Sequence, residues 1–193
     1  SLRDGAATRA IVDFVARVTT AGSPDFVPPA ERIAVFDNDG TLWSEQPLPV
    51  QAAFVLDRIR ALAPDHPEWH DEPPFSAVLA GDASAVMGLG MEGLTRLVMA
   101  THAGLSTEAF AVLVRDWLGS ARHPRFERPH LGLVYRPMLD VLALLRARGF
   151  KNYIVSGGGI EFMRTFSEAA YGIPPEQVIG SSIVTRYVVE DGT

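Results

Sequence analysis

Two aspartates one residue apart, Asp37 and Asp39, are the clearest chemical signal in the sequence. They come directly after an apolar run at 33–36, and Gly40 and Thr41 follow at once. An apolar run that stops so abruptly is typical of a buried parallel strand, and open α/β sheets bind their ligands at the carboxyl ends of such strands. We therefore predict that the functional site lies where this strand ends.

Paired carboxylates at this spacing favour phosphoryl transfer through a covalent intermediate. One carboxylate can act as the nucleophile, while the other protonates the departing oxygen and later deprotonates water. Asp, Asn and Gly also dominate ordinary surface turns, so a turn without chemistry at 37–40 is the alternative. A second motif is needed to decide between the two.

That second motif is the segment Ser-Gly-Gly-Gly at 156–159, which follows an apolar strand-like stretch at 152–155. The segment Asp-Asn-Asp-Gly-Thr resembles the first motif of the haloacid dehalogenase-like hydrolases, most of which are phosphatases. The serine and glycines resemble the second motif of that family, in the form found in its phosphoserine-phosphatase-like branch. The resemblance runs from residue 32 to about residue 189, and both motifs occur in the right order.

The resemblance implies a role for each motif residue. Asp37 would attack phosphorus, and Asp39 would serve first as general acid and then as general base. A Mg²⁺ ion, which prefers oxygen ligands, would contact the Asp37 carboxylate and the Asp39 backbone carbonyl. The phosphoryl group would be bound by Thr41, Ser156, Gly157 and Gly158.

Glu45 bears on the substrate. In phosphoserine phosphatases a glutamate shortly after the first motif meets the substrate ammonium, but Glu45 is one residue short of that spacing and Gln46 takes its place. The resemblance implies a Mg²⁺-dependent phosphomonoesterase acting through an aspartyl-phosphate on a small phosphorylated metabolite, with phosphoserine-like compounds among the candidates. Two alternatives stay open: a phosphomutase, and a non-catalytic or incomplete binding module with the same fold.

Two family elements have no counterpart in the sequence. The third motif supplies a lysine near the phosphoryl group, and the fourth supplies acidic Mg²⁺ ligands after a later strand. No lysine follows Asn152, and Lys151 begins the strand whose other end carries Ser156. We therefore expect this sequence to be part of a longer protein, or a form that lacks full activity by itself.

The elements around the motifs indicate an α/β fold with an insertion. A simple β-α-β unit brings in its second strand after about 30 residues, yet the strand at 152–155 follows the one at 33–36 much later. We predict a Rossmann-like parallel-sheet core formed by residues 1–43 and 137–193. Residues 44–136 would form a helical cap.

Apolar periodicity, capping residues and helix breakers locate the individual elements. Ser106 and Thr107 can cap a helix, Pro137 can begin one, and Gly149 can end it. Glycine amides and the positive end of a helix starting near Ile160 would face the site. Predicted helices are 4–18, one through Phe54 to Leu62, 75–87, 91–103, 107–118, 137–149 and 160–171; a third strand at 177–182 precedes the first arm of a hairpin at 183–189.

Composition restricts the class of partner. With 193 residues and 47% hydrophobic content, the chain can form one core and a smaller additional layer. The formal net charge of −6 gives no basic surface for nucleic acid. No apolar run approaches the roughly 20 residues of a membrane helix. The absence of cysteine excludes disulfides and thiolate metal sites but leaves the compartment open.

Three other patterns have simpler explanations. The sequence Gly-Leu-Gly-Met-Glu-Gly at 88–93 matches a dinucleotide fingerprint, but a helix-prone stretch precedes it instead of a strand. His66 and His70 have the spacing of a zinc helix, yet prolines make their surroundings a loop. A basic cluster over 122–136 could hold an anionic group, although a solvated connection explains it as well.

Overall fold

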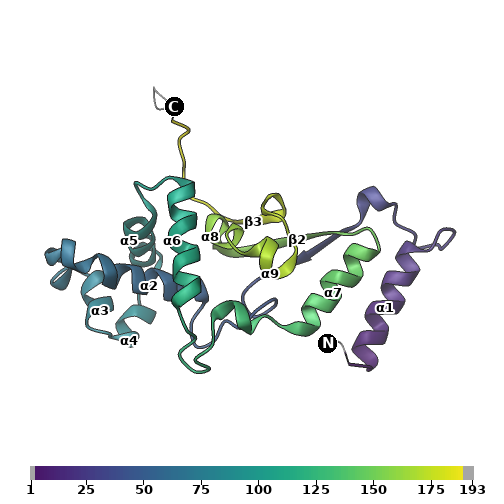
Figure 1. The fold of residues 1–193 in the computed structure, drawn as a ribbon, viewed down its shortest axis with the longest axis horizontal. Helices are drawn as coiled ribbons and strands as arrows, with labels where there is room; N and C mark the ends of the chain where they lie inside the picture. The colour runs from purple at the N-terminus through teal and green to yellow at the C-terminus, as the bar shows by residue number, and fades with distance from the viewer. Residues whose placement is uncertain (1–2, 189–193) are drawn as a thin grey trace.

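The computed structural model describes residues 3–188. The molecule is elongated, with a group of helices at one end, a small sheet in the middle, and α7 and α1 at the other end (Figure 1). The helices are α1 Ala6–Thr19, α2 Val50–Leu62, α3 Phe75–Leu79, α4 Ala83–Met87, α5 Met91–His102, α6 Thr107–Ser120, α7 Arg136–Ala147, α8 Ile160–Arg164 and α9 Ser167–Tyr171, and the strands are β1 Ile33–Phe36, β2 Lys151–Gly159 and β3 Val178–Ser181.

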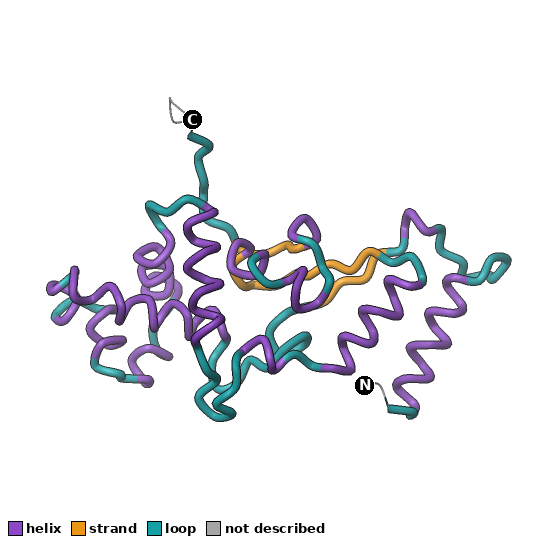
Figure 2. The backbone as a smooth tube through the Cα atoms, in the orientation of Figure 1, coloured by secondary structure: helices purple, strands orange, loops and turns teal. Residues whose placement is uncertain are grey.

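The sheet consists of three parallel strands in the order β1-β2-β3 (Figure 2). Phe36 pairs with Ile154, and Ile154 pairs with Val178, so one row of side chains crosses all three strands. Parallel strands of one sheet are joined by right-handed crossovers in nearly all proteins. Because the strands follow one another in sequence order, such crossovers place their helices on a single face.

Packing shows which face the helices cover. Val15 of α1 and Val141 and Leu145 of α7 form a buried cluster against Ala34 and Phe36 of β1. On the neighbouring strands, buried Ile154 and Val178 belong to the main core together with Phe162 and Met163 of α8. The covered face therefore carries α1, α7 and α8 and contains most of the buried side chains of the sheet.

The opposite face is apolar but exposed. Ile33, Val35, Val155 and Ile179 keep 56%, 58%, 41% and 51% of their surface accessible. Parallel sheets are normally covered on both faces. Within residues 3–188, β1 also has a neighbour on one side alone, so the strand that carries the first motif is an edge strand.

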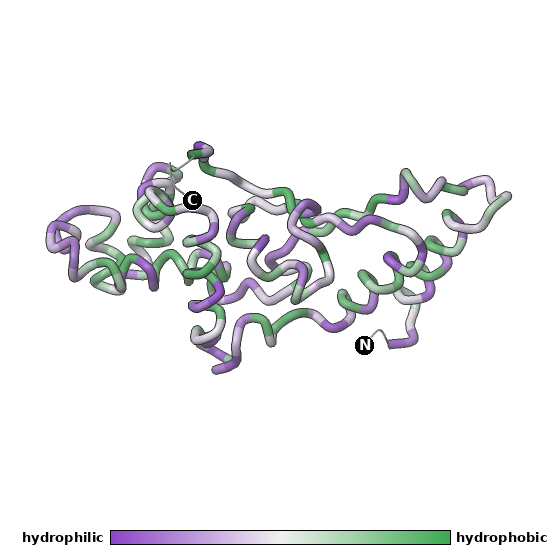
Figure 3. Tube along the Cα trace, turned by 45° about the horizontal axis from the view of Figure 1, so that its top comes forward, coloured by the Kyte–Doolittle hydropathy of each residue, from purple (hydrophilic) through white to green (hydrophobic). Residues whose placement is uncertain are grey.

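The helices α2 to α6 share one hydrophobic core with the sheet. Phe54 of α2 contacts Phe110 and Trp117 of α6 and also Phe162 of α8, with ring centroids 5.5 to 5.8 Å apart. Figure 3 shows apolar and polar residues alternating along these helices. The inserted helices are thus packed directly onto the sheet layer, while the division into a core and a cap remains a prediction.

Most sequence-based assignments of regular structure are confirmed. The Ser106 hydroxyl caps α6 by accepting a hydrogen bond from the Ala109 amide at 3.1 Å. Pro137 lies in the first turn of α7, and Gly149 follows this helix with φ of +79°, a value that favours glycine. Among the described residues no single helix is long and apolar enough to cross a membrane, although α5 and α6 pass the same test together as a pair bent by 100°.

Three assignments are wrong in detail. The predicted helix 75–87 is two short helices, because Gly81 has φ of +69° and Asp82 caps α4 anew. The predicted helix 160–171 is also broken, because Phe166 leaves helical geometry and stacks on Trp43 with ring centroids 4.6 Å apart. Residues 183–188 form no strand, and residue 189, the last of the predicted hairpin arm, lies outside the described residues.

The exposed face of the sheet gives a first prediction. Ile179→Lys should reduce self-association of the 193-residue polypeptide, because a charge on an open apolar face opposes pairing and costs little burial. Sedimentation velocity would measure association, and urea unfolding would measure stability.

Ile154→Lys is the matched control, since Ile154 is 0% exposed on the covered face of the same sheet. This control should lower the free energy of unfolding by several kcal/mol, because an unpaired buried charge is costly. Equal loss of stability in both variants would show that the face at Ile179 is covered.

Candidate active site

The strand register brings the two motifs to the same edge of the sheet. Asp37 follows Phe36, which pairs with Ile154, and Ser156 lies two residues beyond Ile154 on the adjacent strand. Both side chains therefore belong to the carboxyl ends of neighbouring parallel strands, where α/β folds bind ligands. Lys151 pairs with Ile33 at the opposite end of the same two strands, as the sequence predicted.

A tight turn begins directly after Asp37 and contains Asp39. The carbonyl of Asn38 accepts hydrogen bonds from the Thr41 and Leu42 amides at 3.2 and 2.8 Å. Gly40 has φ of +74°, and its amide donates to the Trp43 carbonyl at 3.0 Å. The sequence therefore needs its glycine at this position for backbone reasons, and Thr41 stabilises the turn through its own amide.

The side chain between the aspartates points into the protein. Asn38 is 2% exposed, and its Oδ1 accepts a hydrogen bond of 3.0 Å from the hydroxyl of Tyr171. Burial raises the pKa of Tyr171 far above its usual value, and the charge of Asp39 adds to the rise, so this hydroxyl stays a donor. The inward turn of Asn38 leaves Asp37 exposed and Asp39 partly buried.

Asp39 differs from Asp37 in its surroundings. Its Oδ1 accepts a hydrogen bond of 2.6 Å from Nε1 of Trp43, a residue that is 1% exposed. Burial raises the pKa of Asp39 above its usual value, and the indole hydrogen bond partly opposes this effect. The nearby charges of Asp37 and Glu45 raise this pKa further. Asp39 therefore holds a proton more readily than an ordinary exposed aspartate does.

Glu45 lies over the turn, on the segment that leads to α2. Its carboxylate occupies the space where a side chain at Gly40 would project, so a side chain there would displace Glu45 from the turn. Gln46, which has the spacing expected of the family glutamate, is exposed, and its carbonyl contacts His123 Nε2 at 2.5 Å. The structure thus places Glu45, and not the side chain of Gln46, at the first motif.

The glycine-rich segment is extended, and the helix that begins at Ile160 is shorter than predicted. It belongs to β2, which has an irregularity in its pairing with β3 between Val155 and Gly159. The Gly158 amide donates to Ser156 Oγ at 3.2 Å, and the Ser181 hydroxyl donates to the Gly157 carbonyl at 2.9 Å. Because α8 has five residues, its dipole is a smaller source of positive potential than we expected.

The oxygen donors at the first motif suit a hard divalent cation. Mg²⁺ is usually bound by one or two carboxylates and keeps waters or substrate oxygens as its other ligands. The Asp37 carboxylate is exposed at the end of β1 and can serve as such a ligand, together with the Asp39 carbonyl. Within residues 3–188 no group of three or more acidic or histidine side chains is arranged to hold a metal by itself.

Three contributors to the site were missed from the sequence. Gln51 of α2 accepts a hydrogen bond from the Gly159 amide at 2.6 Å. Tyr171 supports Asn38, and Trp43 contacts Asp39. Trp43 could have been suspected, because an indole four residues after a candidate acid is a suitable donor, whereas Gln51 and Tyr171 carried no recognisable signal.

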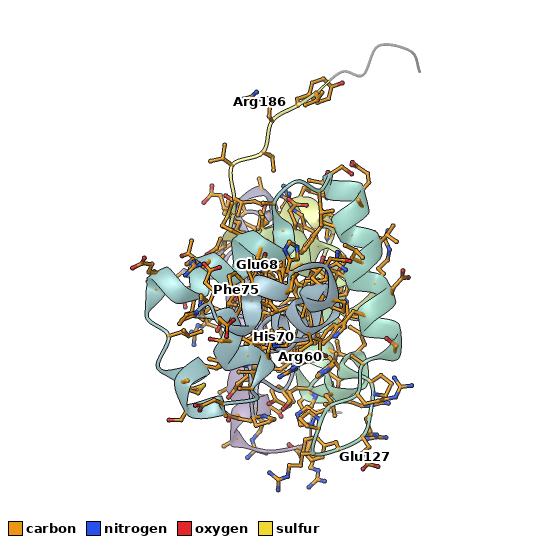
Figure 4. All side chains as sticks on the ribbon, turned by 90° about the vertical axis from the view of Figure 1, so that its left-hand side faces the viewer. Arg60, Glu68, His70, Phe75, Glu127 and Arg186 are labelled. Atoms are coloured by element: carbon orange, nitrogen blue, oxygen red, sulfur yellow. The ribbon has the colours of Figure 1, made fainter. Side chains whose placement is uncertain are left out.

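The other sequence patterns do not join the site. A helix, α4, precedes the glycines at 88–93, so the dinucleotide fingerprint lacks its strand. His66 contacts Glu68 at 3.0 Å in a segment of short 3-10 turns between α2 and α3. Figure 4 labels Glu68 and His70 of this segment. In the basic cluster the arginines are exposed, but His123 and His130 are 3% and 4% exposed. A purely solvated connection is therefore wrong for these two histidines.

Comparison with known proteins agrees with the two motifs. A model of the haloacid dehalogenase-like hydrolase family matches residues 34–192. The match covers both motifs and most of the sequence, so the chain belongs to the haloacid dehalogenase-like hydrolases. No curated protein matches significantly.

One solved structure with similarity to the chain is a phosphoserine phosphohydrolase-like protein from Francisella tularensis subsp. tularensis SCHU S4. The two sequences are 16% identical, the TM-score is 0.42, and the match covers 77% of this chain. The chain spans 57% of the length of that protein.

The Trp43 contact predicts a pH effect. Trp43→Phe removes the hydrogen bond that lowers the pKa of Asp39, so this pKa should rise. If Asp39 acts as an acid, phosphatase activity falls as pH rises through its pKa, and the descending limb of the kcat/KM profile should move to higher pH. The aromatic stack on Phe166 is retained by phenylalanine.

Trp117→Phe is the matched control, because Trp117 Nε1 likewise donates to an aspartate, Asp57, at 3.0 Å but in the inserted helices. It should leave the descending limb in place. A folded Trp43→Phe protein with an unchanged limb would contradict the role of Asp39 as the acid.

Substitution of Gly157 tests whether phosphate binds at the glycine-rich segment. A side chain at Gly157 would meet no atom within 4 Å, so Gly157→Val should fold but fill the open space in front of the segment. If backbone amides hold phosphate there, this variant should weaken orthophosphate inhibition more than Ser156→Ala, which loses one hydrogen bond of about 0.5–1.5 kcal/mol.

Gly132→Val is the control, since a side chain at Gly132 also meets nothing within 4 Å. An inhibition constant for Gly157→Val equal to that of the unsubstituted protein would place the phosphate elsewhere.

Proposed function

We propose that this hydrolase is a phosphomonoesterase that works through an aspartyl-phosphate on Asp37. The observation that carries the proposal is the unequal environment of the two carboxylates. Asp37 is exposed at the end of β1, whereas Asp39 is partly buried and has a raised pKa. Acid and base catalysts of one site are commonly separated by such differences in surroundings.

The proposed reaction has two steps with balanced bonds. An Asp37 oxygen attacks phosphorus and the bond to the ester oxygen breaks, while Asp39 gives its proton to the departing alcohol. Water then attacks the phosphorus of the aspartyl-phosphate, the bond between phosphorus and the Asp37 oxygen breaks, and Asp39 takes a proton from this water. Orthophosphate leaves and both carboxyl groups return to their starting states.

A bound Mg²⁺ would neutralise charge between the phosphate and the carboxylates. The Asp37 carboxylate and the Asp39 carbonyl are the groups of this chain that would hold it. Ser156 and the amides of Gly157 and Gly158 would orient the phosphoryl oxygens, with Thr41 keeping the turn in shape. Positioning and charge stabilisation supply most of the catalysis in phosphoryl transfer.

The expected substrate is a small phosphorylated metabolite. Glu45 places a carboxylate beside the turn of the first motif, and a carboxylate there favours a substrate with a positive group near its phosphate. Phosphoserine-like compounds have that character. A panel of phosphomonoesters with and without an ammonium group, assayed with and without Mg²⁺, tests both the reaction and this preference.

One observation favours a second candidate, a non-catalytic binding module. The described residues contain no metal-binding group of three or more ligands, and Lys151, the one lysine of the sequence, lies at the wrong end of β2. A phosphate placed against Asp37 needs positive charge. Binding of orthophosphate without turnover of any ester in the panel would support this alternative.

Substituting each aspartate separates their roles. Asp37→Asn should abolish turnover and the covalent intermediate together. Asp39→Asn should slow hydrolysis of an alkyl phosphate by about 10²–10⁴-fold, because general acid catalysis contributes that much. Its effect on p-nitrophenyl phosphate should be smaller, because the nitrophenolate needs little protonation to depart. Steady-state rates and rapid-quench trapping of phosphoenzyme provide the measurements.

Asp57→Asn, an exposed aspartate of α2, is the control for loss of one carboxylate. Trapping a phosphoenzyme from Asp37→Asn would exclude Asp37 as the nucleophile. Equal slowing of both substrates in Asp39→Asn would contradict its role as the acid.

A further inference from the structure

Gln51 joins the inserted helices to the glycine-rich segment at the end of β2. It lies in the first turn of α2, and its Oε1 accepts the 2.6 Å hydrogen bond from the Gly159 amide across a sequence separation of 108 residues. In Figure 1, α2 and β2 belong to different parts of the molecule. The contact therefore ties the position of an inserted helix to the backbone of the candidate phosphate site.

The Gln51 carboxamide fills the space beside Gly159. Gly159 has φ of −68° and ψ of 126°, an extended backbone that any residue can adopt. A Cβ at this position would lie 2.5 Å from Gln51 Nε2 and 3.2 Å from Gln51 Oε1. A side chain at 159 would therefore displace the Gln51 carboxamide, although the backbone at this position suits any residue.

The chemistry of the carboxamide suits its place. Its oxygen accepts a hydrogen bond from the amide of Gly159, a residue that is partly buried, as are Ser156 and Gly158, whereas Gly157 is exposed. Unlike a carboxylate, it does so without adding negative charge beside a bound phosphate. The other two glycines of the segment are hydrogen-bonded as well: the Gly158 amide donates to Ser156 Oγ, and the Gly157 carbonyl accepts from the Ser181 hydroxyl.

We propose that Gln51 is a positioning residue that holds segment 156–159 in its phosphate-binding conformation. Phosphate affinity then depends on how α2 is seated against the sheet, which gives the inserted helices control over the site. This inference rests on the proposed function, because it assumes that segment 156–159 binds phosphate. Gln51 itself needs no contact with the substrate.

The first test compares Gln51→Leu and Gln51→Glu with the unsubstituted protein. Leucine removes the acceptor, so exchange of the Gly159 amide with solvent should become roughly twofold to tenfold faster, and orthophosphate should bind more weakly by a similar factor. Glutamate keeps an acceptor but adds charge, so it should preserve amide protection and still weaken phosphate binding. Amide exchange followed by NMR and titration with orthophosphate give the two readouts.

Gln177→Leu is the matched control, because Gln177 ends the 3-10 turn that precedes the amino end of β3. It should change neither readout. A merely structural role for Gln51 predicts that both of its variants lose stability alike, with no separation between amide exchange and phosphate binding.

The second test is a double-mutant cycle between Gln51→Ala and Gly159→Ala. Alanine at 159 should displace the carboxamide and reproduce the loss seen in Gln51→Ala. The double variant should bind orthophosphate no more weakly than either single variant, since both remove the same contact. Additive losses would overturn the proposal.

The outcomes also separate this inference from the proposed function. If orthophosphate fails to bind the unsubstituted protein, both proposals fail, although Gly159 exchange still reports whether the tie exists. If orthophosphate binds the unsubstituted protein and Gln51→Leu equally well, the positioning role is wrong and the proposed function stands.

Discussion

The turn that follows β1 is the constraint on which the rest of the site depends. Its centre, Asn38, is buried, with its carbonyl holding the next amides and its side chain accepting a hydrogen bond from Tyr171 of α9. Leaving a buried polar group unpaired costs about 1–3 kcal/mol, so the turn and α9 stabilise each other. Turning Asn38 inward is also what makes Asp37 and Asp39 unequal, one exposed and one partly buried.

The two faces of the sheet also differ in exposure. Because β1, β2 and β3 follow in order, the helices that join them lie on one face, where Ile154 and Val178 are buried. The other face stays apolar and exposed at Val35 and Ile179. The strand with the proposed nucleophile is at the sheet edge, so within residues 3–188 the site is bounded by β2 on one side alone.

The inserted helices act on the site through packing. Phe54 joins α2 to α6 and α8 in one hydrophobic core, so α2 cannot shift without disturbing the helix that follows the second motif. The same region supplies Glu45 at the first motif and Gln51 at the second. Both candidate phosphate-binding segments are thereby contacted from one part of the chain, which supplies a physical basis for coupling between them.

The sequence by itself determined the family, the parallel α/β fold, most helices and the pairing of the two motifs, because these depend on local periodicity, caps and residue spacing. It failed at the break near Phe166, a residue with non-helical backbone geometry that stacks on the distant Trp43. Only the tertiary structure could show that Gln51 reaches Gly159, that Tyr171 holds Asn38, and that one face of the sheet is open. Those features arise from contacts between distant segments, which no local pattern encodes.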